Sequence, residues 1–148
     1  MQRGCYHLLI RLRRPADIQI GRRGRFRFPA GWYVYTGSAR GGLAARIERH
    51  LSDEKRLHWH VDYLLASAEA RIADVVQFPG PAHSECDLNQ AVGLLDGARA
   101  IVPGFGASDC TAGCPASVDV PAFVAAFADG DIRTAYQVLR RNNLLPEM

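Results

Sequence analysis

The segment "RFRFPAGWYVYTGSARGGLAARIERHL", residues 25–51, constrains the fold most, because its pattern changes once from strand to helix. Up to Gly37, apolar and polar residues alternate with a period of two, which predicts β-strands. Beyond that glycine, Leu43, Ile47 and Leu51 follow one another at helical spacing. We therefore predict a tyrosine-bearing strand that leads directly into a helix.

The flanking segments extend this strand and helix into an α/β fold. Further strands are predicted at "CYHLLIRL", "IQIG", "ARIADVVQF" and "ARAIVPGFG", and further helices at "LHWHVDYLLASA" and from Ser84 onward. Ser84 is a good N-cap, and Glu85 and Asp87 suit the positive end of a helix dipole. The expected fold class is a small antiparallel β-sheet flanked by helices, with one face of "RFRF" packed through phenylalanine and the other kept wet by arginine.

Length and composition indicate one ordinary domain with a small appendage. The chain has 148 residues, of which 48% are hydrophobic and 22% charged, as is typical of soluble globular proteins. No apolar run is long enough to span a bilayer, and the start "MQRGCYHLLIRLRRP" has too short an apolar centre for a secretory signal. Four scattered cysteines do not form the disulfide framework of a small secreted protein. We expect a cytoplasmic protein with reduced thiols and no membrane role.

The charge is distributed unevenly along the chain. Residues 1–56 carry 13 Lys and Arg against 4 Asp and Glu, a net +9, whereas the remainder carries 5 against 11, a net −6. The basic half is therefore the part that would face a polyanion. All but one of the basic residues are arginine, which suits bidentate phosphate contact but is equally what a biased genomic composition would produce.

Several separated motifs resemble one nuclease family. The tripeptide Gly4-Cys5-Tyr6, the run Tyr35-Thr36-Gly37-Ser38, Arg46, His50 and Glu85 resemble the signature of the GIY-YIG nuclease superfamily. More narrowly, "YVYTGSA", "RIERHL", "HWHVDYLL", "SECDL" and "GFGASDC" resemble its DUF123 branch, over roughly residues 1 to 110. Cys5 stands where isoleucine is usual, and since a buried cysteine behaves as a small hydrophobe we expect no loss of function.

The resemblance implies metal-dependent hydrolysis of DNA, or less readily RNA. Water must be deprotonated near the phosphate and the developing charge stabilised. Tyr6 and Tyr35 would place a phenol beside the attacking water. Arg46 would supply the cation that a phenol needs to act as a base, or clamp the phosphate, and His50 would hold the water or the phosphate. Glu85 would hold Mg²⁺ or Mn²⁺ largely through water and substrate oxygens.

Each of these residues also has an ordinary structural explanation when it is taken alone. Either tyrosine suits sheet packing, Arg46 and Glu85 suit a surface pair or helix caps, and His50 suits a solvent-facing helix position. Together and in family order they favour a site.

A second group of residues suggests contacts with nucleic acid. His58, His60 and Asp62 alternate like metal ligands, but on a helix only His58 and Asp62 share a face, so we do not expect a three-ligand zinc site. We expect Trp59 to pack and the two histidines to edge a DNA groove or cap the structure. The candidate phosphate contacts outside the catalytic centre are Arg22, Arg23, Arg25, Arg27 and Arg40.

The composition changes near residue 108, which divides the chain into a nuclease-like domain, residues 1–108, and a helical extension, residues 109–148. The extension resembles the opening of the helical iron–sulfur domain of the glutamate synthase small subunit and dihydropyrimidine dehydrogenase. Two short helices are predicted within residues 117–143, broken at Asp129-Gly130. Cys110 and Cys114 are candidate ligands of a cluster or of zinc, but two thiolates cannot complete either site. We expect a structural or dimerising appendage.

The sequence thus predicts a DNA endonuclease, structure-selective or delivered by a protein partner. Two competing classes stay open: a DNA-binding module without turnover, and an iron–sulfur or redox accessory protein. Convergence of Arg46 and Glu85 with both tyrosines on one cleft would favour the enzyme. Visible absorbance of the purified protein would favour the iron–sulfur or redox accessory protein. Substrate structure and oligomeric state are not encoded in any recognisable motif.

Overall fold

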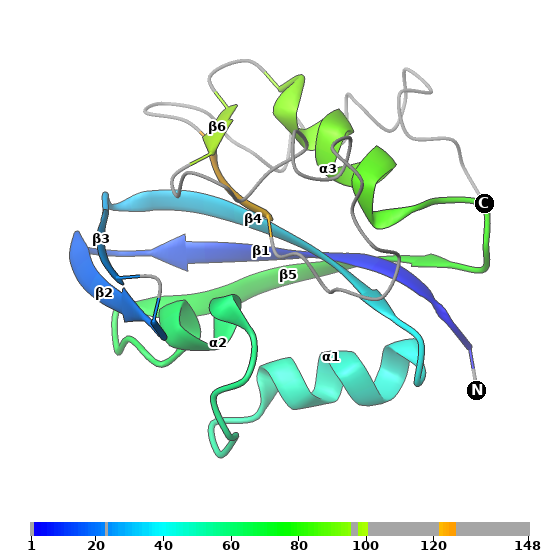
Figure 1. The fold of residues 1–148 in the computed structure, drawn as a ribbon, viewed down its shortest axis with the longest axis horizontal. Helices are drawn as coiled ribbons and strands as arrows, with labels where there is room; N and C mark the ends of the chain where they lie inside the picture. The colour runs from blue at the N-terminus through cyan, green and yellow to red at the C-terminus, as the bar shows by residue number, and fades with distance from the viewer. Residues whose placement is uncertain (1, 23, 96–97, 101–121, 127–148) are drawn as a thin grey trace.

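The computed structural model of the chain describes residues 2–22, 24–95, 98–100 and 122–126. Over these residues the chain forms a five-stranded sheet, a two-stranded sheet and flanking helices (Figure 1). The strands are β1 (Gly4–Leu12), β2 (Ala16–Ile20), β3 (Gly24–Phe28), β4 (Gly31–Ala39), β5 (Ala70–Pro79), β6 (Ala98–Ala100) and β7 (Ala122–Ala126), and the helices are α1 (Leu43–Leu51), α2 (His60–Leu65) and α3 (Glu85–Gly93). None of these helices is long and apolar enough to cross a bilayer. The predicted class, a small antiparallel sheet flanked by helices, is confirmed.

The larger sheet has the strand order β5-β1-β4-β7-β6, and its neighbouring strands are antiparallel. Strand β1 lies between β4 and β5, so both of its edges are paired. Tyr6 stands opposite Gly37 of β4 and Gln77 of β5. This register fixes where the tyrosine enters the core.

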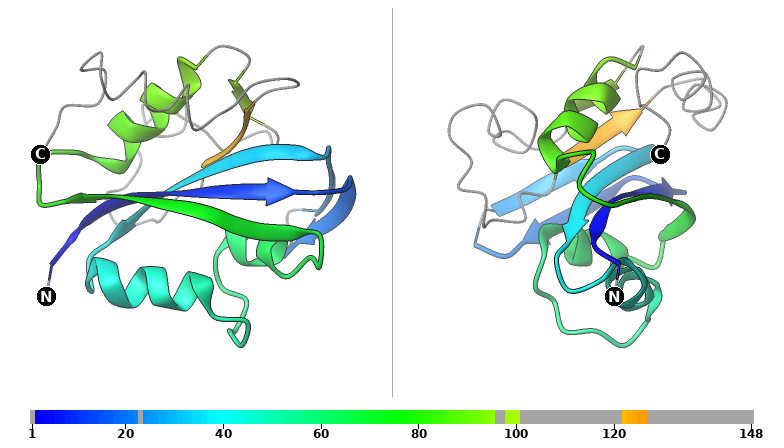
Figure 2. Two further views of the ribbon diagram at one scale, coloured as in Figure 1. Left: turned by 180° about the vertical axis from the view of Figure 1, so that it is seen from behind. Right: turned by 90° about the vertical axis from the view of Figure 1, so that its right-hand side faces the viewer.

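The two faces of this sheet are covered by different helices. Figures 1 and 2 show α1 and α2 on one side and α3 on the other. Because successive residues of a strand point to opposite faces, Tyr6 and Leu8 contribute to the core beneath α1 and α2, whereas Cys5 packs with Leu88 of α3. We call the first the tyrosine face and the second the α3 face.

The tyrosine face carries the main core. Tyr6, Tyr33 and Tyr35 are among the largest fully buried side chains, at most 1% exposed. Phe28 of β3 and Ile20 of β2 join the same cluster, so the two-stranded hairpin closes one end of it. Each such side chain contributes about 1.5–3 kcal/mol by its removal from water.

Helix α1 buries Leu43 and Ile47, as their spacing predicts, but Leu51 is 56% exposed. The third buried residue of the helix is His50 instead. The helix begins after Gly42, whose φ of 113° lies in the left-handed region that favours glycine. The aromatic strand and the helix are therefore joined by a turn that glycine makes possible, and the helix directs a histidine into the core.

Helix α3 follows its predicted start, whereas α2 begins at His60, later than the predicted segment. Helix α3 begins after Ser84, whose hydroxyl accepts a hydrogen bond from the Asp87 N–H at 3.0 Å. Helix α2 is shorter than the predicted segment, residues 57–68, because Asp62 holds the preceding backbone in an extended approach to the helix.

The hairpin β2–β3 confirms the expected division of its two faces. Phe28 is buried and Phe26 half-buried, while Arg25 and Arg27 are exposed. Strands β2 and β3 pair only with each other and form a separate two-stranded sheet.

Strand β7 corrects the prediction for the extension. A helix was expected after Pro121, but residues Ala122–Ala126 form a strand that pairs with Trp32–Thr36 of β4. A short apolar run such as "AFVAA" does not distinguish helix from strand by periodicity, and the edge of β4 supplies backbone partners that favour the strand. The second predicted helix lies outside the described residues.

Candidate functional site

The centre of the site is a hydrogen bond between β1 and α1. The Tyr6 hydroxyl lies 2.7 Å from Nε2 of His50, and the two residues are 0% and 2% exposed. Burial lowers the pKa of His50 to about 4, with nearby cations adding to the effect and Asp62 opposing it. The imidazole is therefore neutral at pH 7.

Tyr35 borders this pair from β4. Its ring centroid lies 6.2 Å from that of Tyr6 and 5.8 Å from that of His50. Like Tyr6, it is buried, at 1% exposure. The two predicted tyrosines therefore share one pocket of the core with the predicted histidine.

Arg46 reaches the same group through an indole ring. Its guanidinium lies 4.1 Å from the ring centroid of Trp59 and donates a hydrogen bond to the Ser38 carbonyl at 2.9 Å. Arg49, one helical turn later, lies at the same distance from that ring. Trp59 in turn contacts His50, with 5.6 Å between ring centroids. The structure thus brings together four predicted residues, Tyr6, Tyr35, Arg46 and His50.

Arg49 is a functional candidate that the sequence did not suggest, and Asp62 was considered from the sequence only as a zinc ligand. Asp62 is fully buried, and both of its carboxylate oxygens accept hydrogen bonds from Arg49, at 3.1 and 2.9 Å. The backbone N–H groups of His58 and Trp59 donate to the same carboxylate, each at 2.9 Å. Burial alone would raise the pKa of Asp62, but these hydrogen bonds bring it below its ordinary value. An acidic residue in the first turn of a helix was the available signal.

Glu85 lies apart from this group. It is the first residue of α3, which packs on the α3 face of the sheet. There Cys5 packs as the small hydrophobe expected, and burial, with Glu85 and Asp87 adding to it, raises its pKa to about 11. The structure does not place the helix of Glu85 on the face that holds Tyr6 and His50.

The described residues do not fit a metal ion beside the Tyr6–His50 pair. Among them, no three His, Cys, Asp or Glu side chains are grouped as metal ligands. Mg²⁺ can be held by one carboxylate with water and substrate oxygens, but the predicted carboxylate, Glu85, belongs to a helix on the other face.

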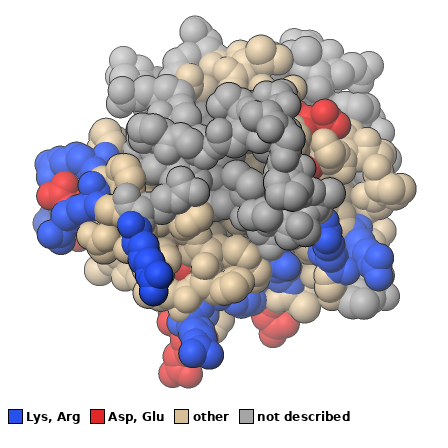
Figure 3. Space-filling view, in the orientation of Figure 1, with Lys and Arg blue, Asp and Glu red and all other residues tan. Residues whose placement is uncertain are grey.

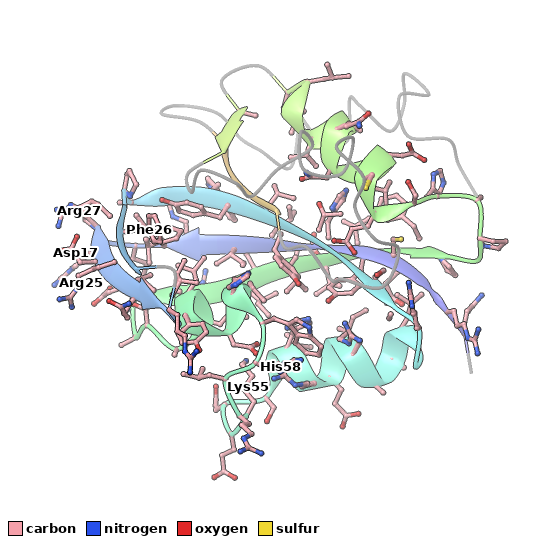
Figure 4. All side chains as sticks on the ribbon, in the orientation of Figure 1. Asp17, Arg25, Phe26, Arg27, Lys55 and His58 are labelled. Carbon is pink, nitrogen blue, oxygen red and sulfur yellow. The ribbon has the colours of Figure 1, made fainter. Side chains whose placement is uncertain are left out.

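The other predicted nucleic-acid contacts lie at several places. His58 is exposed and packs edge-on against Trp59, with 5.0 Å between centroids, and His60 is half-buried at the start of α2. Figure 4 shows Arg25 and Arg27 at the hairpin with Asp17, away from Lys55 and His58. The remaining arginine candidates are Arg22, exposed in the hairpin turn, Arg40, exposed after β4, and Arg23, which lies outside the described residues.

The described members of this set lie at two different ends of the sheet. The basic side chains visible in Figure 3 stand in separate places around the face shown. Arg40 follows the end of β4 that pairs with Gly4, whereas the hairpin lies at the opposite end of β1. Tyr6 and Leu12 are six residues apart on that strand, or about 20 Å. Only Arg40 is therefore at the end of the sheet nearer Tyr6.

A cavity of about 490 Å³ opens between the ends of α1 and α2 and the start of β5. Its lining includes His50, Asp62, Lys55 and Arg71. The Lys55 ammonium donates to the carbonyls of His50 at 2.7 Å and of Ser52 at 3.0 Å. This cavity reaches the His50 and Asp62 end of the site rather than Tyr6.

Family comparison assigns the two parts of the chain differently. Residues 104–148 are similar to the family described as dihydropyrimidine dehydrogenase domain II, 4Fe-4S cluster. Cys110 and Cys114, the candidate cluster ligands, lie outside the described residues. No significant match to the chain was found among curated proteins or among solved structures. Residues 5–118, most of the chain, match the profile described as Domain of unknown function DUF123, and the chain therefore belongs to the DUF123 family.

Proposed function

We propose that the protein is a metal-dependent endonuclease of the GIY-YIG type that hydrolyses DNA phosphodiester bonds. The observation that carries this proposal is the 2.7 Å hydrogen bond between the Tyr6 hydroxyl and Nε2 of a neutral His50. A phenol in water titrates near pH ~10 and is a poor base at neutral pH unless a neighbour accepts its proton. A neutral imidazole at hydrogen-bond distance has a nitrogen that can take this proton; burial weakens it as a base, and Asp62 opposes that effect.

The side chains around this pair support the remaining needs of hydrolysis. As Tyr6 passes its proton to Nε2 of His50, its oxygen takes one from the attacking water. Arg46, held against Trp59, supplies a fixed positive charge for the phosphate oxygens. Tyr35 contacts both Tyr6 and His50 and packs against the pair on the side of β4.

The metal requirement rests on the resemblance to GIY-YIG nucleases. Mg²⁺ or Mn²⁺ would neutralise charge on the phosphate, and Glu85 is the residue expected to hold it. Since α3 lies on the other face of the sheet, no step of the proposed reaction is assigned to the ion.

A second candidate is a DNA-binding module without turnover, and the burial of both tyrosines favours it. Tyr6 and Tyr35 are 0% and 1% exposed, so a phosphate reaches them only if their cover moves. The placement of Glu85 on a helix of the other face points the same way. In this alternative, exposed arginines such as Arg25 bind the DNA backbone and the tyrosines only pack.

Cleavage of labelled linear, flapped and branched DNAs with Mg²⁺ or Mn²⁺ tests the two candidates. The parent should cut at least one of these DNAs, and Tyr6→Phe should cut about 10²- to 10⁴-fold more slowly. Tyr63→Phe is the matched control, since it removes a phenol from a half-buried residue of α2 and should cut normally. Glu85→Ala reports separately on the metal: it should abolish cleavage if that carboxylate holds the ion.

Binding of the same DNAs without any cleavage would reject the enzyme and support the binding module. Equal cleavage by Tyr6→Phe and the parent would remove Tyr6 from the mechanism.

The similarity of residues 104–148 to an iron–sulfur domain supports an accessory redox role as a further alternative. Visible absorbance and a brown colour in anaerobically purified protein would support it. Colourless protein that cuts DNA would leave the tail as a structural or dimerising part.

A further inference from the structure

His50 is held between a phenol and a carboxylate. Its Nε2 lies 2.7 Å from the Tyr6 hydroxyl, and its Nδ1 lies 4.0 Å from Oδ1 of Asp62. Nδ1 is buried and has no hydrogen-bond partner among the described residues. This nitrogen therefore faces the Asp62 carboxylate without a hydrogen bond to it.

A neutral imidazole carries one proton, and the two possible positions are not equivalent here. With the proton on Nδ1, an N–H group faces the carboxylate, and the lone pair of Nε2 accepts the Tyr6 O–H. With the proton on Nε2, the lone pair of Nδ1 faces the negative Asp62 oxygen, which is repulsive. The electrostatics of the site thus favour protonation of Nδ1.

Asp62 is fixed in a way that suits an orienting role. Four hydrogen bonds hold its carboxylate, two from Arg49 and one each from the backbone N–H groups of His58 and Trp59. These bonds stabilise the ionised form although the side chain is fully buried. The carboxylate keeps both its charge and its direction toward His50.

The other groups that face His50 do not supply an alternative to Asp62. Tyr6 from β1 and Tyr35 from β4 approach the ring with phenols. Arg46 and Arg49 of the same helix and Lys55 after it are cations, which disfavour a second proton on the ring without selecting a nitrogen for the first. Asp62 of α2 is the acidic group.

We propose that Asp62 is a positioning residue that keeps the His50 proton on Nδ1 and so leaves Nε2 free to take the proton of Tyr6. The tautomer follows from the contact between Asp62 and His50 and does not require the nuclease function. Its role in hydrolysis rests on the proposed nuclease function.

The proton balance of the step is simple. The O–H bond of Tyr6 breaks and an N–H bond forms at Nε2, while an O–H bond of the attacking water breaks and the Tyr6 O–H re-forms. His50 is then an imidazolium beside the Asp62 carboxylate, which stabilises its positive charge. The 490 Å³ cavity lined by both residues gives the extra proton a route to solvent.

The nitrogen-15 chemical shifts of the histidine rings in the parent protein test the proposal directly. His50→Gln identifies the His50 signals by their loss. At pH 7 we expect Nδ1 to show the shift of a protonated nitrogen and Nε2 that of an unprotonated one. The opposite assignment overturns the proposal, and the tautomer itself is read in the parent protein.

Two variants sharpen the test. Asp62→Asn removes the charge at nearly the same shape and should shift His50 toward the Nε2-protonated form, whereas Tyr6→Phe should leave Nδ1 protonated. If the nuclease is active, Asp62→Asn should lower kcat about 10- to 100-fold with little change in KM and should displace the pH profile of kcat. A folded Asp62→Asn protein with an unchanged His50 tautomer contradicts the role of Asp62.

The two proposals fail in different ways. An Nδ1-protonated His50 in a protein that cuts no DNA would keep the inference and reject the enzyme. Cleavage by a protein whose His50 is Nε2-protonated would reject the inference alone.

Discussion

The two faces of β1 bury ionisable side chains in opposite ways. On the tyrosine face, Tyr6 and His50 are linked to Asp62, a fully buried carboxylate that stays charged. On the α3 face, Cys5 and His7 are buried as neutral groups, because burial raises the pKa of the thiol to about 11 and lowers that of the imidazole to about 3. The same exclusion of water thus has different outcomes on the two faces: the Asp62 carboxylate of α2 stays charged, whereas Cys5 and His7 of β1 are neutral.

The difference depends on whether partners stabilise the charged form of each group. The Asp62 carboxylate accepts four hydrogen bonds, two of them from a guanidinium. His7 has a 2.9 Å hydrogen bond to Thr36, and the Cys5 thiol donates weakly to the His83 carbonyl. Desolvation prevails at Cys5 and His7, and ionisation survives at Asp62, where several donors converge. A buried charge therefore marks the tyrosine face as the chemically unusual one.

The largest loss of stability is expected when the Asp62 carboxylate is removed. Asp62→Ala should lower the free energy of unfolding by about 3–5 kcal/mol, since Arg49 and two backbone N–H groups lose their acceptor. Urea unfolding at pH 7 measures the loss. Asn89→Ala is the matched change on α3, because Asn89 is 2% exposed and its side-chain amide has no hydrogen-bond partner among the described residues. Asn89→Ala should lower the free energy of unfolding by less than about 1 kcal/mol. If Asp62→Ala and Asn89→Ala lowered it equally, the two faces would not differ in this respect.

The pH dependence of stability comes next. The pKa values of His50 and His7 in the folded protein are about 4 and about 3, below the ordinary 6.5, so the unfolded chain binds more protons between these values. Stability is therefore fully present above about pH 6.5 and falls as the pH drops, by up to about 1.4 kcal/mol per pH unit for each histidine. Urea unfolding between pH 7 and 4.5 measures this decline.

His50→Gln sharpens the same comparison, since it should remove the contribution of the tyrosine face and leave that of His7. A parent protein whose stability is constant over this range would show that neither histidine is buried neutral.

A smaller loss of stability is expected at Gly37, which lies opposite Tyr6 on the neighbouring strand. A Cβ atom on Gly37 would lie 2.6 Å from the Tyr6 hydroxyl oxygen and 3.1 Å from the Tyr35 ring. Gly37→Ala should therefore cost about 1–3 kcal/mol through overpacking. Gly41→Ala, where a Cβ meets nothing within 4 Å, should be within about 0.5 kcal/mol of the parent. Thermal unfolding compares the two, and similar melting temperatures would argue against tight packing at Tyr6.

The smallest effect on stability is expected at the exposed hairpin. Arg27 and Asp17 form a 3.3 Å ion pair with side chains 64% and 50% exposed. Arg27→Ala should change the free energy of unfolding by less than about 1 kcal/mol. If the hairpin binds DNA, the same variant should weaken binding at low salt and reduce its salt dependence by about one phosphate contact, with Arg71→Ala of β5 as the control. An unchanged salt dependence would place the DNA elsewhere.

Local patterns predicted much of the fold. The alternation in residues 25–37 and the helical spacing after it correspond to β3, β4 and α1. The cap at Ser84 marks the start of α3. Of the residues that the family motif groups, Tyr6, Tyr35 and His50 contact one another and Arg46 reaches His50 through Trp59, whereas Glu85 belongs to a helix on the other face.

What the sequence could not supply depends on contacts between distant segments. Asp62 and Arg49 are 13 positions apart and ordinary by themselves, and only the packing of α2 against α1 joins them around His50. The face on which Glu85 lies is set by the path of the chain around the edge of the sheet. Leu51 had the right spacing for the core, but the helix turns its last residue outward and buries His50.

The pairing of β7 with β4 has a practical consequence for the boundary predicted near residue 108. A protein shortened there would lose β7 and leave the backbone donors and acceptors of Trp32–Thr36 along an open edge. Open edges of this kind recruit strands from other copies. We therefore expect the shortened protein to self-associate and lose solubility, because the sheet itself extends through Ala126.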